Sequence, residues 1–181
     1  MKVSIAPRRR ASAGYRSRLN REQSRLSMLA IPIISVLLGS MVTTLPIITT
    51  QAILPPLGLM IFLSWRLLRP GFWPMWSGLP LGLFDDIFSG SPFGSAALIW
   101  SLMMIALELI DSRAVWRDYL QDWLVAAIII ALSIVGGWFF LGLSGAKPHL
   151  ETLAPQIILS IFCYPLIVRL VSRLDSWRLA T

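Results

Sequence analysis

Two adjacent aspartates, Asp85 and Asp86, lie within an apolar, glycine-rich stretch, GLPLGLFDDIFSGSPFG, at residues 78–94. Paired acids can act as a general acid and base, bind a cation, or hold helices together through hydrogen bonds. Consecutive residues of a helix point about 100° apart, so these two carboxylates cannot share one site as a catalytic dyad does. We therefore expect one acid to face protein and the other to face solvent or lipid headgroups.

Other residues that could support catalysis or metal binding are sparse. A metal site for prenyl diphosphates needs a third acid shortly after the pair, and the sequence DDIFS has none. Nucleophilic catalysis needs a histidine near a serine, and the single histidine, His149, lies in the loop sequence GAKPHLE. The single cysteine, Cys163, excludes an intramolecular disulfide and a cysteine-rich metal site. We predict a protein that is not an enzyme and has no catalytic residue, metal or cofactor.

Small residues recur around the acids at intervals of four. The series is Gly78, Gly82, Asp86, Gly90 and Gly94. A helix through all of them would carry a small-residue groove that lets another helix approach closely, with Asp86 in its middle.

Pro92 is expected to end or bend this helix, so Gly94 can instead serve the turn. We predict that Asp86 is buried and accepts hydrogen bonds from backbone N–H groups of the SGSPFG turn or from the next helix. Asp85 is then the peripheral acid. Helix termination and packing is the preferred interpretation of the pair, and partner binding is the alternative.

The composition predicts a membrane protein. Of 181 residues, 56% are hydrophobic and only 14% are charged, and the mean hydropathy is +0.71. A soluble domain needs a larger charged shell, whereas an apolar helix of about 20 residues satisfies its own backbone hydrogen bonds in a bilayer. The apolar segments are 28–48, 52–68, 72–88, 93–110, 123–143 and 153–171. We predict an all-α, polytopic membrane protein with six transmembrane helices.

The second and third segments are short and interrupted by proline and glycine. Lipid cannot satisfy a freed backbone carbonyl, so such segments are expected inside the bundle or against a partner. In the sixth segment, the pair Tyr164-Pro165 predicts a kink.

The basic residues predict the orientation of the chain. With six crossings and both termini in the cytoplasm, every one of the 16 Lys and Arg residues except Lys147 lies on the cytoplasmic side. A different number of spans would scatter the later basic clusters over both sides. The net charge of +7 is thus mostly a matter of membrane topology.

Polar segments flank the predicted membrane domain of residues 28–174. The N-terminal tail, 1–27, is predicted to be disordered and to contact anionic lipid headgroups rather than nucleic acid. Residues 111–122, DSRAVWRDYLQD, predict a short helix in the cytoplasmic interface, and residues 175–181 a cytoplasmic C-terminal tail. The candidate membrane-surface residues are Arg8, Arg9, Arg10, Arg16, Arg18, Arg21, Arg25, Trp116 and Tyr119.

The stretch LGLFDDIFSGSPFG resembles the signature of the rod shape-determining protein MreD family. In that signature a glycine-rich span ends in apolar–Asp–apolar–apolar–Ser–Gly–Ser–Pro–apolar–Gly. The matching positions are Asp86, Ser89, Gly90, Ser91, Pro92, Phe93 and Gly94. The preceding segment is also similar, with Pro55 or Pro56 at its start, Trp65 at its end, and then Arg69-Pro70. Asp85 and Ser95 depart from this pattern. Outside the motif region, the rest of the chain is similar to the family only in hydropathy.

The resemblance implies a scaffold of the bacterial elongation machinery in the inner, cytoplasmic membrane. Such a protein binds the single-span protein MreC and thereby links the actin-like MreB filament to the polymerase RodA and its class-B transpeptidase. The fold implied is similar to the substrate-binding subunits of vitamin importers, and the groove would organise a surface for a partner helix. The candidate residues for partner and helix packing are Gly78, Gly82, Asp86, Ser89, Gly90, Pro92 and Gly94. The alternative is a small-molecule transporter subunit of the vitamin type, because short, broken helices also occur at transport sites.

Overall fold

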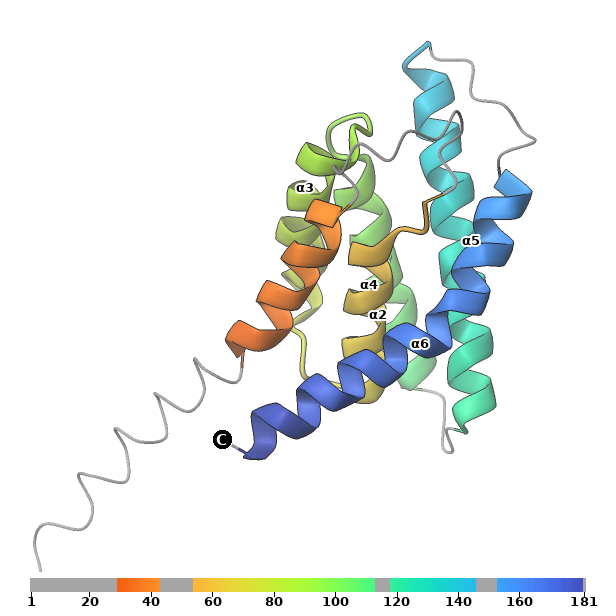
Figure 1. Ribbon diagram of the computed structural model, residues 1–181. Coiled ribbons are helices and arrows are strands. Elements are labelled where there is room, and N and C mark those ends of the chain that lie inside the picture. The colour runs from red at the N-terminus through yellow and green to blue at the C-terminus, as the bar shows by residue number, and fades with distance from the viewer. Residues whose placement is uncertain (1–28, 43–53, 113–117, 146–152, 181) are drawn as a thin grey trace, which may run out of the picture.

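The computed structural model describes residues 29–42, 54–112, 118–145 and 153–180, and within these ranges the fold is all-helical (Figure 1). This confirms the predicted all-α class. Among the helices of these described ranges, two are long and apolar enough to cross a membrane. The elements are an N-terminal helix, Leu29–Val42, then α2 (Leu57–Leu68), the 3₁₀ helix η1 (Met75–Ser77), α3 (Gly78–Ser89), α4 (Ser95–Asp111), α5 (Tyr119–Leu143) and α6 (Leu153–Ala180).

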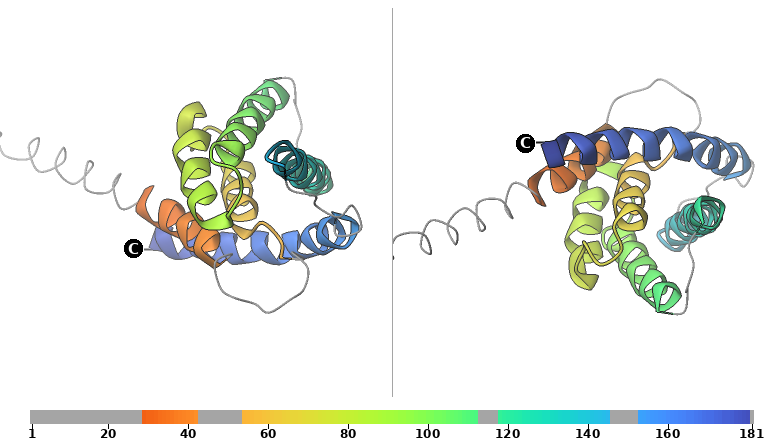
Figure 2. Two further views of the ribbon diagram at one scale, coloured as in Figure 1. Left: turned by 90° about the horizontal axis from the view of Figure 1, so that it is seen from above. Right: turned by 90° about the horizontal axis from the view of Figure 1, so that it is seen from below.

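Helix α2 occupies the centre of the bundle, with the other helices around it (Figure 2). Residues 58–67 are all buried, as expected for a helix that is apolar on every side. At 1.5 Å per residue the helix is only about 18 Å long, shorter than the roughly 30 Å hydrocarbon core of a bilayer. Protein therefore covers this short element, and the prediction that the second segment lies in the interior is confirmed.

The N-terminal helix packs closely against α2. A Cβ atom added to Gly39 would lie 3.3 Å from Gly58 Cα, and one added to Gly58 would lie 3.2 Å from Ser40 N. Both distances are shorter than ordinary Cβ contacts, so glycine at the two positions favours this close crossing of the helices. Nearer the other end of α2, the Trp65 indole N–H donates to the Ser35 hydroxyl over 2.9 Å. The first two apolar segments are thus fastened together at two levels.

Several element boundaries differ from those expected. The third segment begins irregularly, because Pro74 precedes a single 3₁₀ turn and the α-helix starts only at Gly78. No separate interfacial helix covers the described part of 111–122: α4 ends at Asp111 and α5 begins at Tyr119. Residues 175–180, expected as a tail, continue α6.

Helix α6 changes direction about halfway along its length (Figure 1). Pro165 lies inside the helix, and a proline there removes one backbone hydrogen bond and clashes with the preceding turn. The bend agrees with the kink predicted at Tyr164-Pro165. It directs the second half of α6 across the end of α2.

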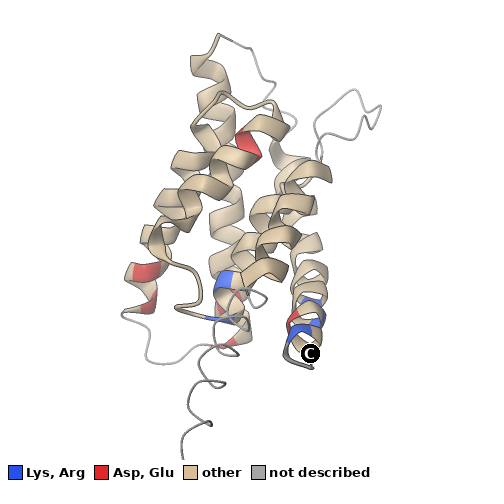
Figure 3. Cartoon of the chain, turned by 90° about the vertical axis from the view of Figure 1, so that its left-hand side faces the viewer, with Lys and Arg blue, Asp and Glu red and all other residues tan. Residues whose placement is uncertain are grey.

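The charged residues of the described ranges are divided unequally between the two ends of the bundle (Figure 3). The basic segments lie toward the end that carries the C-terminus, and one isolated acidic segment lies toward the opposite end. We call these the basic end and the acid-pair end. The described basic residues are Arg66, Arg69, Arg169, Arg173 and Arg178.

Candidate functional site

The turn between α3 and α4 depends on two glycines in the left-handed conformation. Helix α3 ends at Ser89, and Gly90 follows with φ of 67°. Gly94, which precedes the first residue of α4, has φ of 92°. Residues with a Cβ atom rarely adopt such angles. The four-residue repeat therefore does not continue as one groove, and both Gly90 and Gly94 serve the turn.

Asp86 lies at the start of α4, although it belongs to α3. The residue is 4% exposed. Its Oδ1 accepts from the Ala96 backbone N–H over 2.8 Å and from the Ser95 hydroxyl over 3.1 Å. Its Oδ2 accepts from the backbone N–H groups of Gly94, over 2.9 Å, and Ala97, over 3.3 Å. The predicted burial of Asp86 and its bonding to the turn and the next helix are confirmed.

These contacts account for the free backbone donors at the start of α4. The first N–H groups of a helix have no intrahelical acceptor, and a side chain at the N-cap usually supplies one. Here the N-cap residue, Gly94, has no side chain, so Asp86 takes that role for Gly94, Ala96 and Ala97. The Ser95 N–H donates to the Pro92 carbonyl. The negative carboxylate also lies at the positive end of the helix dipole.

Gly78 and Gly82 face α4 along the same side of α3 as Asp86. A Cβ atom on Gly82 would lie 2.6 Å from Ala97 Cα, and one on Gly78 would lie 2.7 Å from the Trp100 carbonyl oxygen. Both distances are too short for any side chain, so the two backbones are in direct contact. The groove is therefore filled by α4 of the same chain. The expected close approach of helix backbones is thus made within the chain, and the role of these glycines in organising a surface for a partner helix stays a prediction.

The prediction that Asp85 is peripheral and faces away from the protein is wrong. Its carboxylate lies near the Ser40 hydroxyl of the N-terminal helix, because both would contact a Cβ atom added to Gly58. A Cβ atom added to Gly58 would lie 2.9 Å from Asp85 Oδ1. The two acids do point apart, but the N-terminal helix and α2 cover the side of α3 that carries Asp85. Both acids therefore connect helices.

The remaining predicted residues are placed as follows. Ser89 is exposed at the end of α3, and Pro92 is half-buried in the turn. Tyr119 is exposed in the first turn of α5. Outside the described residues lie Arg8, Arg9, Arg10, Arg16, Arg18, Arg21, Arg25 and Trp116.

A second polar cluster at the basic end was not anticipated from the sequence. The side chain of Arg66, in the last turn of α2, is only 1% exposed and its Nη2 lies 2.9 Å from Glu108 Oε2 and 2.8 Å from Asp111 Oδ2. Both acids are in the last turn of α4, where the helix dipole disfavours negative charge, and the guanidinium offsets this. An acid within the apolar sequence MMIALELI was the available signal, since such a charge is costly without a partner.

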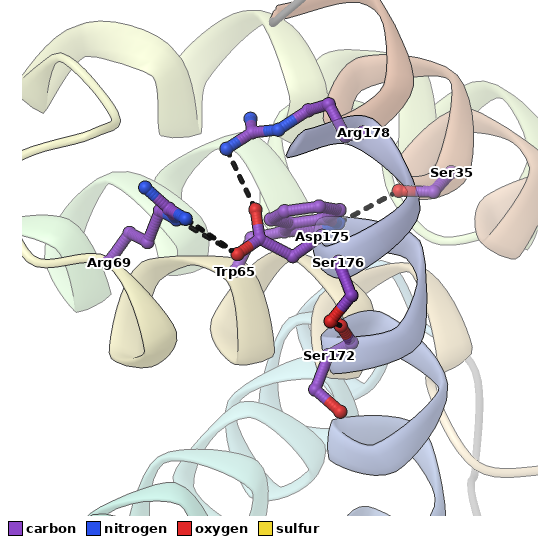
Figure 4. Close-up of polar contacts among 7 residues, drawn as sticks. All are labelled: Ser35, Trp65, Arg69, Ser172, Asp175, Ser176 and Arg178. Atoms are coloured by element: carbon purple, nitrogen blue, oxygen red, sulfur yellow. Dashed lines mark hydrogen bonds and ion pairs between the residues drawn. The ribbon is translucent and has the colours of Figure 1, made fainter. Parts of the chain in front are cut away.

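A neighbouring network joins α6 to α2 (Figure 4). Asp175 Oδ2 accepts from Arg69 Nη2 over 2.8 Å and Nε over 3.0 Å, and Asp175 Oδ1 lies 2.7 Å from Arg178 Nη2. The Arg178 guanidinium stands 5.3 Å from the Trp65 ring centre and 5.0 Å from that of Phe72, within the range of a cation–π contact. These contacts explain why α6 stays helical beyond residue 174.

The described polar groups in the apolar helices are thus engaged mainly with one another. A carboxylate that accepts four hydrogen bonds, as Asp86 does, is poorly placed to act as a base or nucleophile. In the described ranges no group of three or more His, Cys, Asp or Glu residues is arranged to hold a metal ion. What the arrangement can do is fix the positions of α2, α3, α4 and α6.

The sequence was compared with known proteins and families. No curated protein matches the chain, and no solved structure matches it. The profile of one family, described as rod shape-determining protein MreD, matches residues 21–174. This span includes the whole α3–α4 unit with Asp86 and its turn, and covers most of the 181 residues. The chain therefore belongs to the rod shape-determining protein MreD family.

Proposed function

We propose that this chain is a non-enzymatic, integral-membrane scaffold of the machinery that builds the wall of rod-shaped bacteria. Membership of the MreD family supports a role in determining rod shape. The observation that carries the scaffold role is that the Asp86 carboxylate accepts hydrogen bonds from backbone N–H groups at the start of α4 and thereby joins α3 to α4. A rigid α3–α4 unit offers a fixed surface and carries out no reaction.

In this proposal the chain crosses the inner membrane six times, with both termini in the cytoplasm. The concentration of described basic residues at one end of the bundle supports this orientation (Figure 3), because cytoplasmic ends of membrane proteins are enriched in Lys and Arg. The acid-pair end then faces the periplasm. The short helix α2 is compatible with this placement because protein covers it.

The partner that we propose is MreC, through which the chain is linked to MreB, RodA and the class-B transpeptidase. The outward faces of α3 and α4 are the candidate surface, since large apolar side chains are exposed there. They include Trp76, Leu79 and Ile87 near and on α3, and Leu98, Leu102 and Leu109 on α4. On the opposite side of α3, the close contact of Gly78 and Gly82 with α4 fixes the spacing of the two helices and so supports this surface.

The test is co-purification of MreC with the full chain and with Asp86→Leu, normalised to the folded chain recovered from the membrane. We expect the substitution to reduce MreC recovery severalfold and to give rounded cells, because α3 and α4 lose their fixed spacing. Ser144→Ala, at an exposed position where α5 ends and outside the candidate surface, is the control and should behave as wild type. Unchanged MreC recovery and normal rods with Asp86→Leu would count against the proposal.

The alternative, a vitamin-type transporter subunit, gains no support from the described pocket. That pocket lies between α2, α5 and α6 and has a volume of about 60 Å³. Sites for molecules the size of a vitamin typically occupy a few hundred Å³ or more. A group of only a few heavy atoms fits there.

A further inference from the structure

Two arginines on the second half of α6 have no acidic partner among the residues that the structure describes. Arg169 and Arg173 are both exposed, and neither forms an ion pair within those ranges. The other described arginines, Arg66, Arg69 and Arg178, are each paired with a carboxylate. The charges of Arg169 and Arg173 are therefore available to a ligand.

The side chains of Arg169 and Arg173 lie on the same face of α6, one turn apart. Residues four positions apart in a helix have Cβ atoms about 5–6 Å from each other, and two like charges at this spacing repel. An anion held between the two guanidinium groups offsets this repulsion. Guanidinium groups also match the oxygens of a phosphate in geometry, because they donate two parallel hydrogen bonds. The pair therefore favours a phosphate group as its ligand.

The same face of α6 continues away from the arginines with large exposed apolar side chains. Leu166 lies one turn before Arg169 and is 62% exposed, and Phe162 lies two turns before it and is 73% exposed. Residues at this spacing share one side of a helix. Residues 153–174 of α6 include no acid that would repel an anion. A ligand that covers this face thus needs one anionic end and a long apolar body.

The length of α6 agrees with a lipid headgroup at the two arginines. At 1.5 Å per residue, Arg169 lies roughly 24 Å along the helix from its first residue, Leu153, and Arg173 lies roughly 30 Å from it. The hydrocarbon core of a bilayer is about 30 Å thick, so a helix that starts at one boundary brings both arginines to the opposite one. Beyond the bend, α6 runs obliquely across the end of α2 (Figure 1), so both arginines stay near that boundary.

We propose that the face of α6 formed by Phe162, Leu166, Arg169 and Arg173 binds an anionic phospholipid such as phosphatidylglycerol. The phosphate lies between the two arginines, and an acyl chain lies against the two apolar side chains. Charge complementarity accounts for the headgroup, and the apolar side chains favour a lipid over a free phosphate ion or an acidic protein segment. The inference rests on the proposed membrane placement but not on the proposed partner.

The test is lipid retention by the full chain in detergent, measured by native mass spectrometry after addition of phosphatidylglycerol or phosphatidylcholine with identical acyl chains. We expect the unaltered chain to retain phosphatidylglycerol more strongly, because the choline cation offsets the phosphate charge of phosphatidylcholine. Equal retention of the two lipids would overturn the proposal. The basic N-terminal tail also attracts anionic lipid, so variants are needed to locate the site.

Arg169→Gln combined with Arg173→Gln should lower the retention of phosphatidylglycerol by roughly tenfold, since each arginine near an anionic headgroup contributes severalfold. Both arginines are exposed, so unfolding in detergent should be unchanged. Arg8→Gln combined with Arg9→Gln removes the same charge from the N-terminal tail and is the matched control, with retention close to that of the unaltered chain. Equal losses from the two pairs would show that net charge alone attracts the lipid, and this result would overturn the site.

Phe162→Ala combined with Leu166→Ala should also weaken retention, because the acyl chain loses its contacts, and inorganic phosphate should not displace the lipid. Undiminished retention in this variant, with displacement by inorganic phosphate, would assign the arginines to a free phosphate ion and overturn the lipid assignment. MreC recovery is scored in parallel. Loss of MreC with unchanged lipid retention in the arginine variant would assign this face to a protein, whereas failure of the scaffold role alone leaves the lipid preference in place.

Discussion

The backbone N–H of Ala96 donates to Asp86 Oδ1 over 2.8 Å, so the first turn of α4 is capped by a side chain of α3. An N-cap is normally supplied by the residue next to the helix. Here that residue is Gly94, whose backbone must adopt a conformation that other residues avoid. Capping from a neighbouring helix means that α3 cannot move relative to α4 without exposing buried donors. The close glycine contacts along the same side of α3 add to this constraint.

Asp86→Leu should lower the free energy of unfolding by about 3 kcal/mol, because buried N–H groups of Gly94, Ala96 and Ala97 lose their acceptor. Asp86→Asn should lie between this variant and wild type, since an amide has one acceptor oxygen and turns two donors toward the same N–H groups. The measurement is unfolding of the detergent-solubilised chain by sodium dodecyl sulfate, followed by circular dichroism. Ser89→Ala serves as the control, and an Asp86→Leu protein as stable as that control would refute the capping role.

Gly82→Ala should destabilise the chain by about 2 kcal/mol, because its Cβ would lie 2.6 Å from Ala97 Cα and 2.7 Å from Ala97 N, and backbone atoms cannot move aside easily. Gly137→Ala in α5 is the matched substitution, since a Cβ there has no heavy atom within 4 Å. It should be neutral or slightly stabilising, because alanine favours the helix by up to about 1 kcal/mol. Thermal unfolding of the two variants side by side is sufficient, and equal effects would contradict a direct backbone contact between α3 and α4.

The sequence was most informative where the relevant contacts are local. Asp86 lies within eleven residues of every donor that it binds, so the spacing of glycines and the SGSPFG turn were enough to predict its burial. The apolar segments likewise reveal each helix directly, because hydrophobic length is a property of a single segment. Proline and glycine within the second segment correctly indicated a helix covered by protein.

Contacts between distant segments were not predictable in the same way. Asp85 was assigned to the periphery because adjacent residues point apart, but the N-terminal helix, with Ser40, packs on that side of α3. The pairing of Arg66 with Glu108 joins residues 42 positions apart and depends on the relative placement of α2 and α4. Asp175 looked like part of a polar tail because its partner Arg69 is 106 positions away. Spacing along one helix carries no information about such partners.

In the cluster of Arg66, Glu108 and Asp111, neutralising the two acids should destabilise the chain more than replacing the arginine does. Glu108→Gln combined with Asp111→Asn leaves a guanidinium that is 1% exposed without a counter-charge, and we expect a loss of about 3 kcal/mol. Arg66→Met leaves two acids that reach solvent, at 62% and 18% exposure, and replaces the guanidinium with an apolar chain, so the loss should stay within about 1 kcal/mol. Unfolding in detergent provides the measurement. A larger loss from Arg66→Met than from the double acid variant would show that burial of the charge is not the dominant cost.

The orientation of the bundle can be tested with two single-cysteine variants. Cys163→Ser removes the natural thiol, after which Ser89→Cys places a thiol at the exposed end of α3 and Ser176→Cys places one on the exposed side of α6. Because the described basic residues gather at the end that carries Ser176, we expect a membrane-impermeant maleimide to label Ser89→Cys, but not Ser176→Cys, in spheroplasts. Inverted membrane vesicles should give the opposite pattern. Permeabilised cells, in which both thiols react, control for accessibility, and labelling of both variants from the same side would exclude the proposed six crossings.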